Sequence, residues 1–219
     1  MKRKHRVIVL RFWAAAVLAL CVDSLYAQDL FSDKDLVKEL QRGGYNIYFR
    51  HAATDWSQND RVAAEGDWTS CDPARMRQLS KEGRADAKRI GAAIRRLDIP
   101  VGIVMASEYC RTRQTAQLMD LGPVETTRMI INMRVAELVG GPNAVVDRAR
   151  RVLATPPQAG TNTVLVAHGN LMLAATGAYG EEAGAGIFMP QTDGSVKLVA
   201  QLAPEDWGRL ADIFGRGAD

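Results

Sequence analysis

The fold is decided by the stretch Tyr45–Asp55, which has the sequence YNIYFRHAATD. It begins with a short apolar run, Tyr45–Phe49, of the kind that forms a buried strand in a parallel sheet. Two further runs have the same character: VGIVMA at Val101–Ala106 and TVLVA at Thr163–Ala167. We therefore expect three buried strands of one sheet, each followed directly by polar residues.

Segments with helical periodicity separate these strands. Ser32 is expected to begin one helix, Ser80–Leu97 carries apolar residues on one side, and Asn143–Leu153 is another candidate. Strands that alternate with helices predict an α/β three-layer sandwich, with a mostly parallel central sheet and helices on both faces.

The remaining chain predicts a hairpin, a last helix and one long loop. The runs Gly186–Met189 and Val196–Leu202 flank turn residues, as the strands of a hairpin do, and Pro204–Phe214 is expected to be helical. The segment Asp55–Asp72 is polar and has no clear period. Long loops of this kind often lie over a functional site.

Length and composition fit one globular domain behind an export signal. The chain has 219 residues, of which 47% are hydrophobic and 24% charged. Five basic residues precede the apolar run Phe12–Val22, which is too short to span a bilayer comfortably, and Ala27 follows. We predict a signal peptide at residues 1–27, a single domain at residues 28–219, and a periplasmic or secreted bacterial protein with no membrane span in the mature chain.

Charge and cysteine content agree with export. The net charge of +3 depends on the signal, because residues 28–219 hold 23 of the 28 basic and 24 of the 25 acidic side chains. The basic character is therefore no sign of nucleic-acid binding, and we expect no such partner. Cys71 and Cys110 remain after cleavage, and in an oxidising compartment they form a disulfide or stay as two separate thiols.

Two arginines and two histidines follow the expected strands. Arg50 and His51 come after the first strand, Ser107 and Arg111 after the second, and His168 after the third. Ligands of open α/β sheets bind outside the carboxyl ends of the strands, so these side chains should share one rim. Guanidinium groups bind phosphate oxygens in pairs, and a neutral imidazole is a nitrogen nucleophile. The set predicts phosphoryl transfer, which also needs a carboxyl group to protonate the leaving oxygen.

Four segments resemble the histidine phosphatase superfamily, which has the phosphoglycerate-mutase-like fold. They occur in the family's order and are RHAAT at Arg50–Thr54, LSKEGRADA at Leu79–Ala87, SEYCRTRQTA at Ser107–Ala116 and VAHGN at Val166–Asn170. The wording of the first segment, the signal and the cysteines look most like small exported bacterial members. Two departures are Ala52, where the family has Gly, and Glu108, where Pro is common.

The resemblance implies a role for each of these residues. His51 would accept the phosphoryl group, and Arg50, Arg111 and His168 would bind it. Glu137 fits best as the general acid, while Glu181 and Glu182 lie where other branches of the family carry theirs. Thr54, Ser107 and Asn170 are further substrate-binding candidates.

Other functions fit the sequence less well. CDPARMR at Cys71–Arg77 has the spacing of cysteine-dependent phosphatases but follows no strand and lacks Gly. A mutase would need cytoplasmic intermediates, and a non-catalytic phosphate-binding or partner-binding domain is the alternative from another class.

The spacing of the histidines predicts no metal site, and we expect no cofactor. The substrate, a phosphorylated small molecule or a phosphoglycan, and the oligomeric state stay open.

Overall fold

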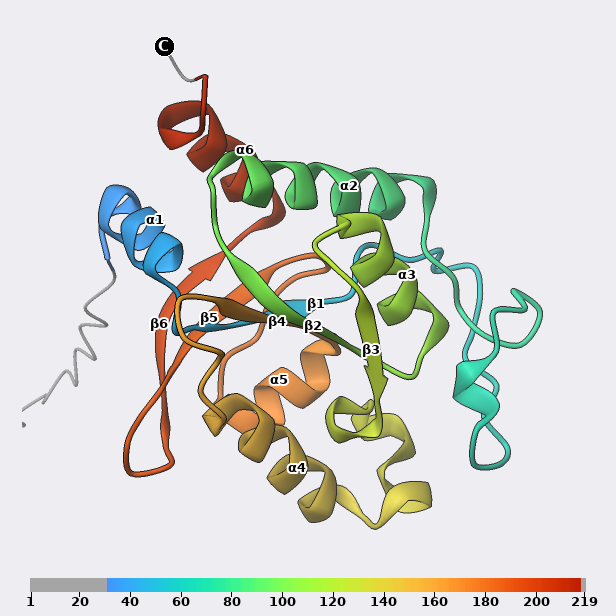
Figure 1. The fold of residues 1–219 in the computed structure, drawn as a ribbon. Helices are drawn as coiled ribbons and strands as arrows, with labels where there is room; N and C mark the ends of the chain where they lie inside the picture. The colour runs from blue at the N-terminus through green and yellow to red at the C-terminus, as the bar shows by residue number, and fades with distance from the viewer. Residues whose placement is uncertain (1–30, 218–219) are drawn as a thin grey trace, which may run out of the picture.

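The computed structural model describes residues 31–217, and the predicted signal peptide lies outside them. A six-stranded sheet with the order β3-β2-β4-β1-β5-β6 forms the centre of the molecule (Figure 1). The pairs β3–β2, β2–β4 and β4–β1 are parallel, and β1–β5 and β5–β6 are antiparallel. The strands are β1 (Asn46–Arg50), β2 (Val101–Ser107), β3 (Val124–Thr127), β4 (Asn162–Ala167), β5 (Ala185–Pro190) and β6 (Val196–Leu202).

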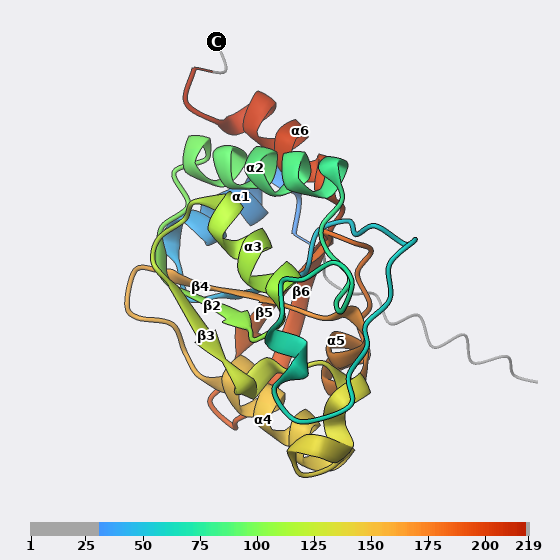
Figure 2. The same ribbon diagram turned by 90° about the vertical axis from the view of Figure 1, so that its right-hand side faces the viewer.

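Helices cover both faces of this sheet, which confirms the predicted α/β sandwich (Figures 1 and 2). Four helices lie on one face: α1 (Asp33–Arg42), α2 (Lys81–Arg96), α3 (Cys110–Met119) and α6 (Pro204–Phe214). The other face is covered by α4 (Pro142–Ala154) and α5 (Gly169–Thr176). Three short 3₁₀ helices complete the described chain: η1 (Asp67–Thr69), η2 (Arg128–Ile130) and η3 (Met133–Val139).

The alternation of side chains along β1 divides the core between the two faces. Successive residues of a strand point to opposite sides of the sheet. Ile47 and Phe49 accordingly pack with α1, α2 and α6, whereas Tyr48 packs with α4 and α5. Because β1 is buried on both faces, its central residues Ile47–Phe49 are all apolar rather than alternating, as predicted for a buried strand.

Side-chain caps fix the starts of the two predicted serine-initiated helices. The Ser32 hydroxyl accepts a hydrogen bond from the Asp35 amide at 3.3 Å, and the Ser80 hydroxyl accepts one from the Gly83 amide at 3.0 Å. The expected hairpin is also present, with β5 and β6 joined through residues 191–195. No helix in the described part of the chain is both long enough and apolar enough to cross a membrane.

Candidate active site

The parallel strands β2, β4 and β1 deliver the predicted polar residues to one edge of the sheet. Arg50 ends β1, Ser107 ends β2, and His168 follows β4 as the residue before α5. The rings of His51 and His168 have centroids 5.7 Å apart and meet edge to face. Both histidines are almost completely buried, so the sheet topology brings them together in the interior.

The contacts of His51 leave one of its ring nitrogens free to act as a nucleophile. Nδ1 lies 3.0 Å from the carbonyl oxygen of Ala52. A carbonyl only accepts hydrogen bonds, so Nδ1 carries the proton and Nε2 keeps its lone pair. Burial and then the positive charge of Arg111 hold the pKa of His51 well below its ordinary value. His51 is therefore neutral at neutral pH.

His168 has the opposite tautomer, which Asn132 determines. The amide oxygen of Asn132 accepts hydrogen bonds from the Arg134 amide at 3.0 Å and from the Asn170 side chain at 2.8 Å. Its amide nitrogen therefore donates to Nδ1 of His168, at 2.9 Å. The proton of His168 then lies on Nε2, which donates to the Ser107 hydroxyl oxygen at 2.9 Å. Burial, followed by the charge of Arg111, also holds the pKa of His168 well below its ordinary value.

A cavity of about 130 Å³ lies beside the two rings, and its lining includes several cationic side chains. Four of the lining residues carry guanidinium groups: Arg50, Arg77, Arg111 and Arg134. The cavity has room for a group of a few heavy atoms, since one water occupies about 30 Å³ of liquid. Its charge suits a compact anion. The complete lining is Arg50, His51, Asp60, Arg77, Arg111, Asn132, Arg134, His168, Gly169, Asn170 and Tyr179.

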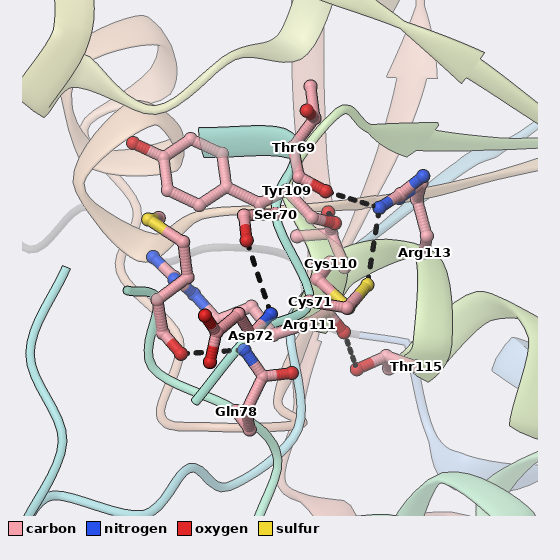
Figure 3. Close-up of a disulfide and its surroundings, with 12 residues drawn as sticks. Thr69, Ser70, Cys71, Asp72, Gln78, Tyr109, Cys110, Arg111, Arg113 and Thr115 are labelled. Atoms are coloured by element: carbon pink, nitrogen blue, oxygen red, sulfur yellow. Dashed lines mark hydrogen bonds between the residues drawn. A yellow bond between two sulfur atoms is a disulfide. The ribbon is translucent and has the colours of Figure 1, made fainter. Parts of the chain in front are cut away.

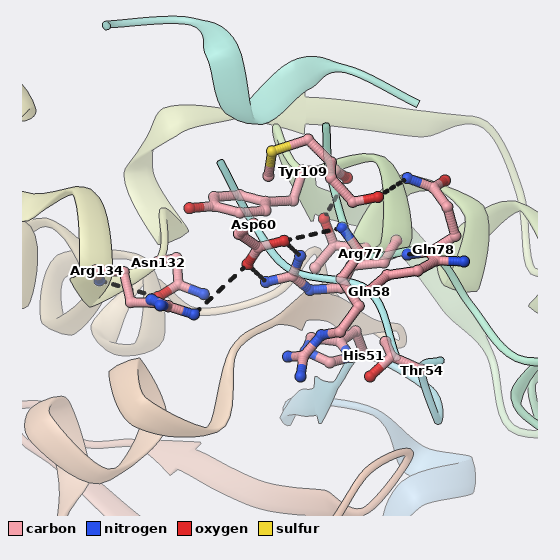
Figure 4. Close-up of polar contacts among 12 residues, drawn as sticks. His51, Thr54, Gln58, Asp60, Arg77, Gln78, Tyr109, Asn132 and Arg134 are labelled. Carbon is pink, nitrogen blue, oxygen red and sulfur yellow. Dashed lines mark hydrogen bonds and ion pairs between the residues drawn. The ribbon is translucent and has the colours of Figure 1, made fainter. Parts of the chain in front are cut away.

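Arg111 is held by a carboxylate that the sequence analysis did not single out. Its two Nη atoms donate to the two carboxylate oxygens of Asp60 at 3.0 and 3.1 Å, and both side chains are buried (Figure 4). Within residues 31–217 the Nε of Arg111 is buried and has no hydrogen-bond partner. Asp60 lies in the long polar loop, where no sequence pattern distinguishes it from its neighbours.

Glu182 links the arginine of β1 to the residues after His51. The Thr54 hydroxyl donates to Glu182 at 2.8 Å, and an Nη of Arg50 lies 3.6 Å from the same carboxylate oxygen. Glu181 and Glu182 line a separate, larger cavity of about 820 Å³, which shares Arg50 with the smaller one. Thr54 therefore supports the site through Glu182 and is not among the residues that line the smaller cavity.

Glu137, the first choice for the general acid, lies on η3 with an exposed side chain. It lines neither of these two cavities. Asn170 does line the smaller cavity and, through Asn132, belongs to the network that orients His168. The structure thus gathers His51, His168, Arg50, Arg111, Ser107 and Asn170 and leaves Glu137 apart.

The start of α2 packs against the backbone that follows His51. The Ser80 amide donates to the Ala53 carbonyl oxygen at 2.9 Å. A Cβ atom at Gly83 would lie 2.1 Å from that same oxygen, so only glycine permits the approach. This contact gives the physical reason for a glycine at position 83, within the segment Leu79–Ala87.

Cys71 and Cys110 form a disulfide, which resolves the two readings of these residues (Figure 3). The bond joins the long loop to the first residue of α3, directly before Arg111. A bonded Cys71 has no thiolate, so it cannot be the nucleophile of a cysteine-dependent phosphatase in this form. In residues 31–217 no three His, Cys, Asp or Glu side chains are grouped so that they could hold a metal ion.

Comparison with known proteins defines the class to which this site belongs. A family model described as the histidine phosphatase superfamily (branch 1) matches residues 47–142. That segment therefore belongs to this superfamily, which confirms the predicted resemblance to the superfamily. The expectation of a small exported member stays a prediction. No curated protein sequence matches the chain.

Solved structures with the same fold include three of low sequence identity. A putative alpha-ribazole-5'-P phosphatase from Escherichia coli has 14% identity and a TM-score of 0.53, covering 74% of this chain and 98% of that one. The product of an open reading frame from Mycobacterium tuberculosis has 19% identity and a TM-score of 0.52, covering 74% and 100%. A phosphoserine phosphatase mutant from Entamoeba histolytica, in complex with phosphoserine, has 13% identity and a TM-score of 0.50, covering 74% and 98%. At such identities the likeness establishes the phosphoglycerate-mutase-like fold.

Proposed function

We propose that the protein is a phosphomonoester hydrolase that forms a phosphohistidine intermediate on His51. Arg50, Arg111 and His168 bind the phosphoryl group in this proposal. The observation that carries it is the pairing of Nδ1 of His51 with the Ala52 carbonyl, beside a cavity lined by four guanidinium groups. A neutral imidazole with a free Nε2 lone pair is a suitable nucleophile, and the cations stabilise the charge that spreads over the phosphoryl oxygens in the transition state.

His168 complements this nucleophile as a hydrogen-bond donor. Its neutral ring carries a proton on Nε2, which bonds to Ser107 in the free protein. A phosphoryl oxygen that enters the cavity offers this N–H a stronger, charged acceptor. The resemblance predicts Glu137 as the general acid, but its side chain is exposed on η3 and lines neither of the two cavities.

The substrate is proposed only as a class, a phosphorylated small molecule or a phosphoglycan. The volume and the guanidinium lining of the cavity support a terminal phosphate, which such substrates share. We further propose that the protein acts in the periplasm or outside the cell. This proposal is supported by the disulfide between Cys71 and Cys110, because such bonds persist in oxidising compartments.

The test is release of phosphate from p-nitrophenyl phosphate by the chain from Gln28 onward, with EDTA present. We expect metal-independent turnover that disappears in His51→Ala, because His168, the other ring that lines the cavity, carries its proton on Nε2. Vanadate binding by His51→Ala serves as the control for an intact cavity. Turnover that survives this substitution contradicts the assignment of the nucleophile, and vanadate binding without turnover in the wild type indicates a binding domain.

A further inference from the structure

Asp60 is the one carboxylate, among the residues described by the structure, that lines the cavity containing both histidines. Its side chain is almost fully buried, and it lies beside the guanidinium group of Arg111. The other acidic candidates lie elsewhere: Glu137 is exposed on η3, and Glu182 lines the larger cavity. We propose that Asp60 is the catalytic residue that gives a proton to the leaving oxygen and later takes one from water.

The position of Asp60 suits this role, because it lines two cavities. It lines the cavity of the histidines, and together with Arg134 it also lines a second cavity of about 210 Å³. The remaining walls of the second cavity are Val62, Tyr109 and Val135. A phosphate ester with its phosphoryl group in the first cavity and its alcohol in the second would place the bridging oxygen beside Asp60.

The arrangement also suits in-line transfer. The attacking nitrogen and the leaving oxygen must lie on opposite sides of phosphorus. Asp60 and His51 both line the cavity, and Figure 4 shows their side chains apart from each other. In the proposed complex the leaving oxygen lies opposite His51 and faces Asp60.

The charged groups around Asp60 explain how a carboxylate bound to arginine acquires a proton. In the free protein it accepts hydrogen bonds from both Nη atoms of Arg111 and from the Arg77 amide, the latter at 3.1 Å. An Nη of Arg134 lies 4.0 Å away, and Tyr109 stacks on the Arg111 guanidinium. A phosphate ester that enters as its monoanion brings one proton with it, since the second pKa of such esters is about 6. Two anions that share one guanidinium repel each other, and transfer of that proton to Asp60 removes the repulsion.

The proposed steps are balanced in bonds and protons. Nε2 of His51 attacks phosphorus, the bond from phosphorus to the ester oxygen breaks, and the Asp60 carboxyl proton passes to that oxygen as the alcohol leaves. Water then attacks the phosphohistidine while the Asp60 carboxylate takes one of its protons. The bond from nitrogen to phosphorus breaks, so inorganic phosphate and neutral His51 are regenerated. This assignment rests on the proposed function.

The experiment compares two leaving groups in Asp60→Asn, a substitution that preserves shape and one acceptor for Arg111. Nitrophenolate leaves without needing a proton, whereas the alkoxide of an alkyl phosphate such as glycerol phosphate needs one. We expect Asp60→Asn to lower the rate constant of phosphohistidine formation from glycerol phosphate on the order of a hundredfold or more, and that from p-nitrophenyl phosphate by less than about fivefold. The first turnover with each substrate is measured by quenched flow, so that the slower attack of water does not obscure the difference.

Glu65→Gln is the matched control, because it removes the same charge from an exposed position in the same loop. Glu137→Gln is measured alongside, and Asp60→Ser provides a second, smaller substitution of the buried carboxylate. An equal loss with both substrates, with weaker vanadate binding, means that Asp60 only positions Arg111 and overturns the proposal. Unchanged rates, or a loss for glycerol phosphate in Glu137→Gln instead, overturn it as well. Failure of the proposed function is distinct, since it appears as turnover that survives His51→Ala.

Discussion

At the scale of single residues, the two buried histidines differ in which ring nitrogen carries the proton, although both are almost completely buried and line the same cavity. His51 keeps its proton on Nδ1, because the Ala52 carbonyl accepts it, and leaves Nε2 unprotonated. His168 keeps its proton on Nε2, because the Asn132 amide donates to Nδ1. One ring therefore presents a lone pair and the other an N–H. A phosphoryl transfer site needs both, since it joins a nucleophile to donors that stabilise the oxygens.

Asn132 should accordingly affect turnover through the orientation of His168. In Asn132→Ala the Nδ1 of His168 loses its donor, and the proton is free to occupy either ring nitrogen. Partners that orient metal-bound histidines are worth about 10- to 100-fold in function, and we expect a loss of that order in kcat. Steady-state assays with p-nitrophenyl phosphate measure it. The matched control is Asn143→Ala, at an exposed position on α4, and equal rates for the two variants would refute the tautomer argument.

At the scale of elements, the disulfide attaches the long loop to the helix that carries Arg111. The bridged cysteines are 39 positions apart, and the loop between them contains Arg77 while Asp60 precedes it. Arg113 strengthens the same junction by donating to the Thr69 carbonyl oxygen at 2.7 Å (Figure 3). The covalent bond therefore restrains the polypeptide that supplies the Asp60 and Arg77 side of the cavity.

Removal of this bond should destabilise the protein measurably. The chain-entropy account of a loop of this length gives a stabilisation on the order of 4 kcal/mol, with typical measured values of about 2–4. We expect Cys71→Ser with Cys110→Ser to lower the free energy of unfolding by about that amount, as measured by urea denaturation. Dithiothreitol should lower the Tm of the wild type and leave that of the double variant unchanged. A wild-type Tm insensitive to the reductant would contradict the prediction.

The sequence predicted those elements whose residues repeat a pattern and missed those that depend on tertiary contact. The buried strands β1, β2 and β4 are apolar runs, and the histidines that follow them could be located from the sequence alone. The edge strand β3 was missed, because Val124–Thr127 is partly exposed and has only one apolar residue. Asp60 and Asn132 were missed for a related reason. Each is a polar residue in an irregular segment, and only the folded chain brings it to Arg111 or His168.

At the scale of the whole molecule, burial of the two histidines should lower the stability of the fold at acidic pH. The sheet and its two helical layers bury both histidines beside cationic arginines, which disfavours a further positive charge. The folded protein therefore holds these rings neutral at a pH where the unfolded chain would protonate them. The nucleophilicity that we propose at neutral pH and the expected loss of stability at acidic pH have the same physical origin.

This origin predicts the direction of the pH dependence of stability. Both histidine pKa values are lowered in the folded state, so below about pH 6.5 the unfolded chain binds more protons than the folded one. The free energy of unfolding should be constant above that pH and should fall below it, by up to about 1.4 kcal/mol per pH unit for each histidine. Urea denaturation between pH 5 and 8 measures the slope, in a range where most carboxylates stay ionised. His168→Gln should halve the slope, because one of the two buried imidazoles is gone. A wild-type stability that stays level from pH 7 to pH 5 would mean that the histidines gain protons without unfolding, and the neutral nucleophile would then lose its physical basis.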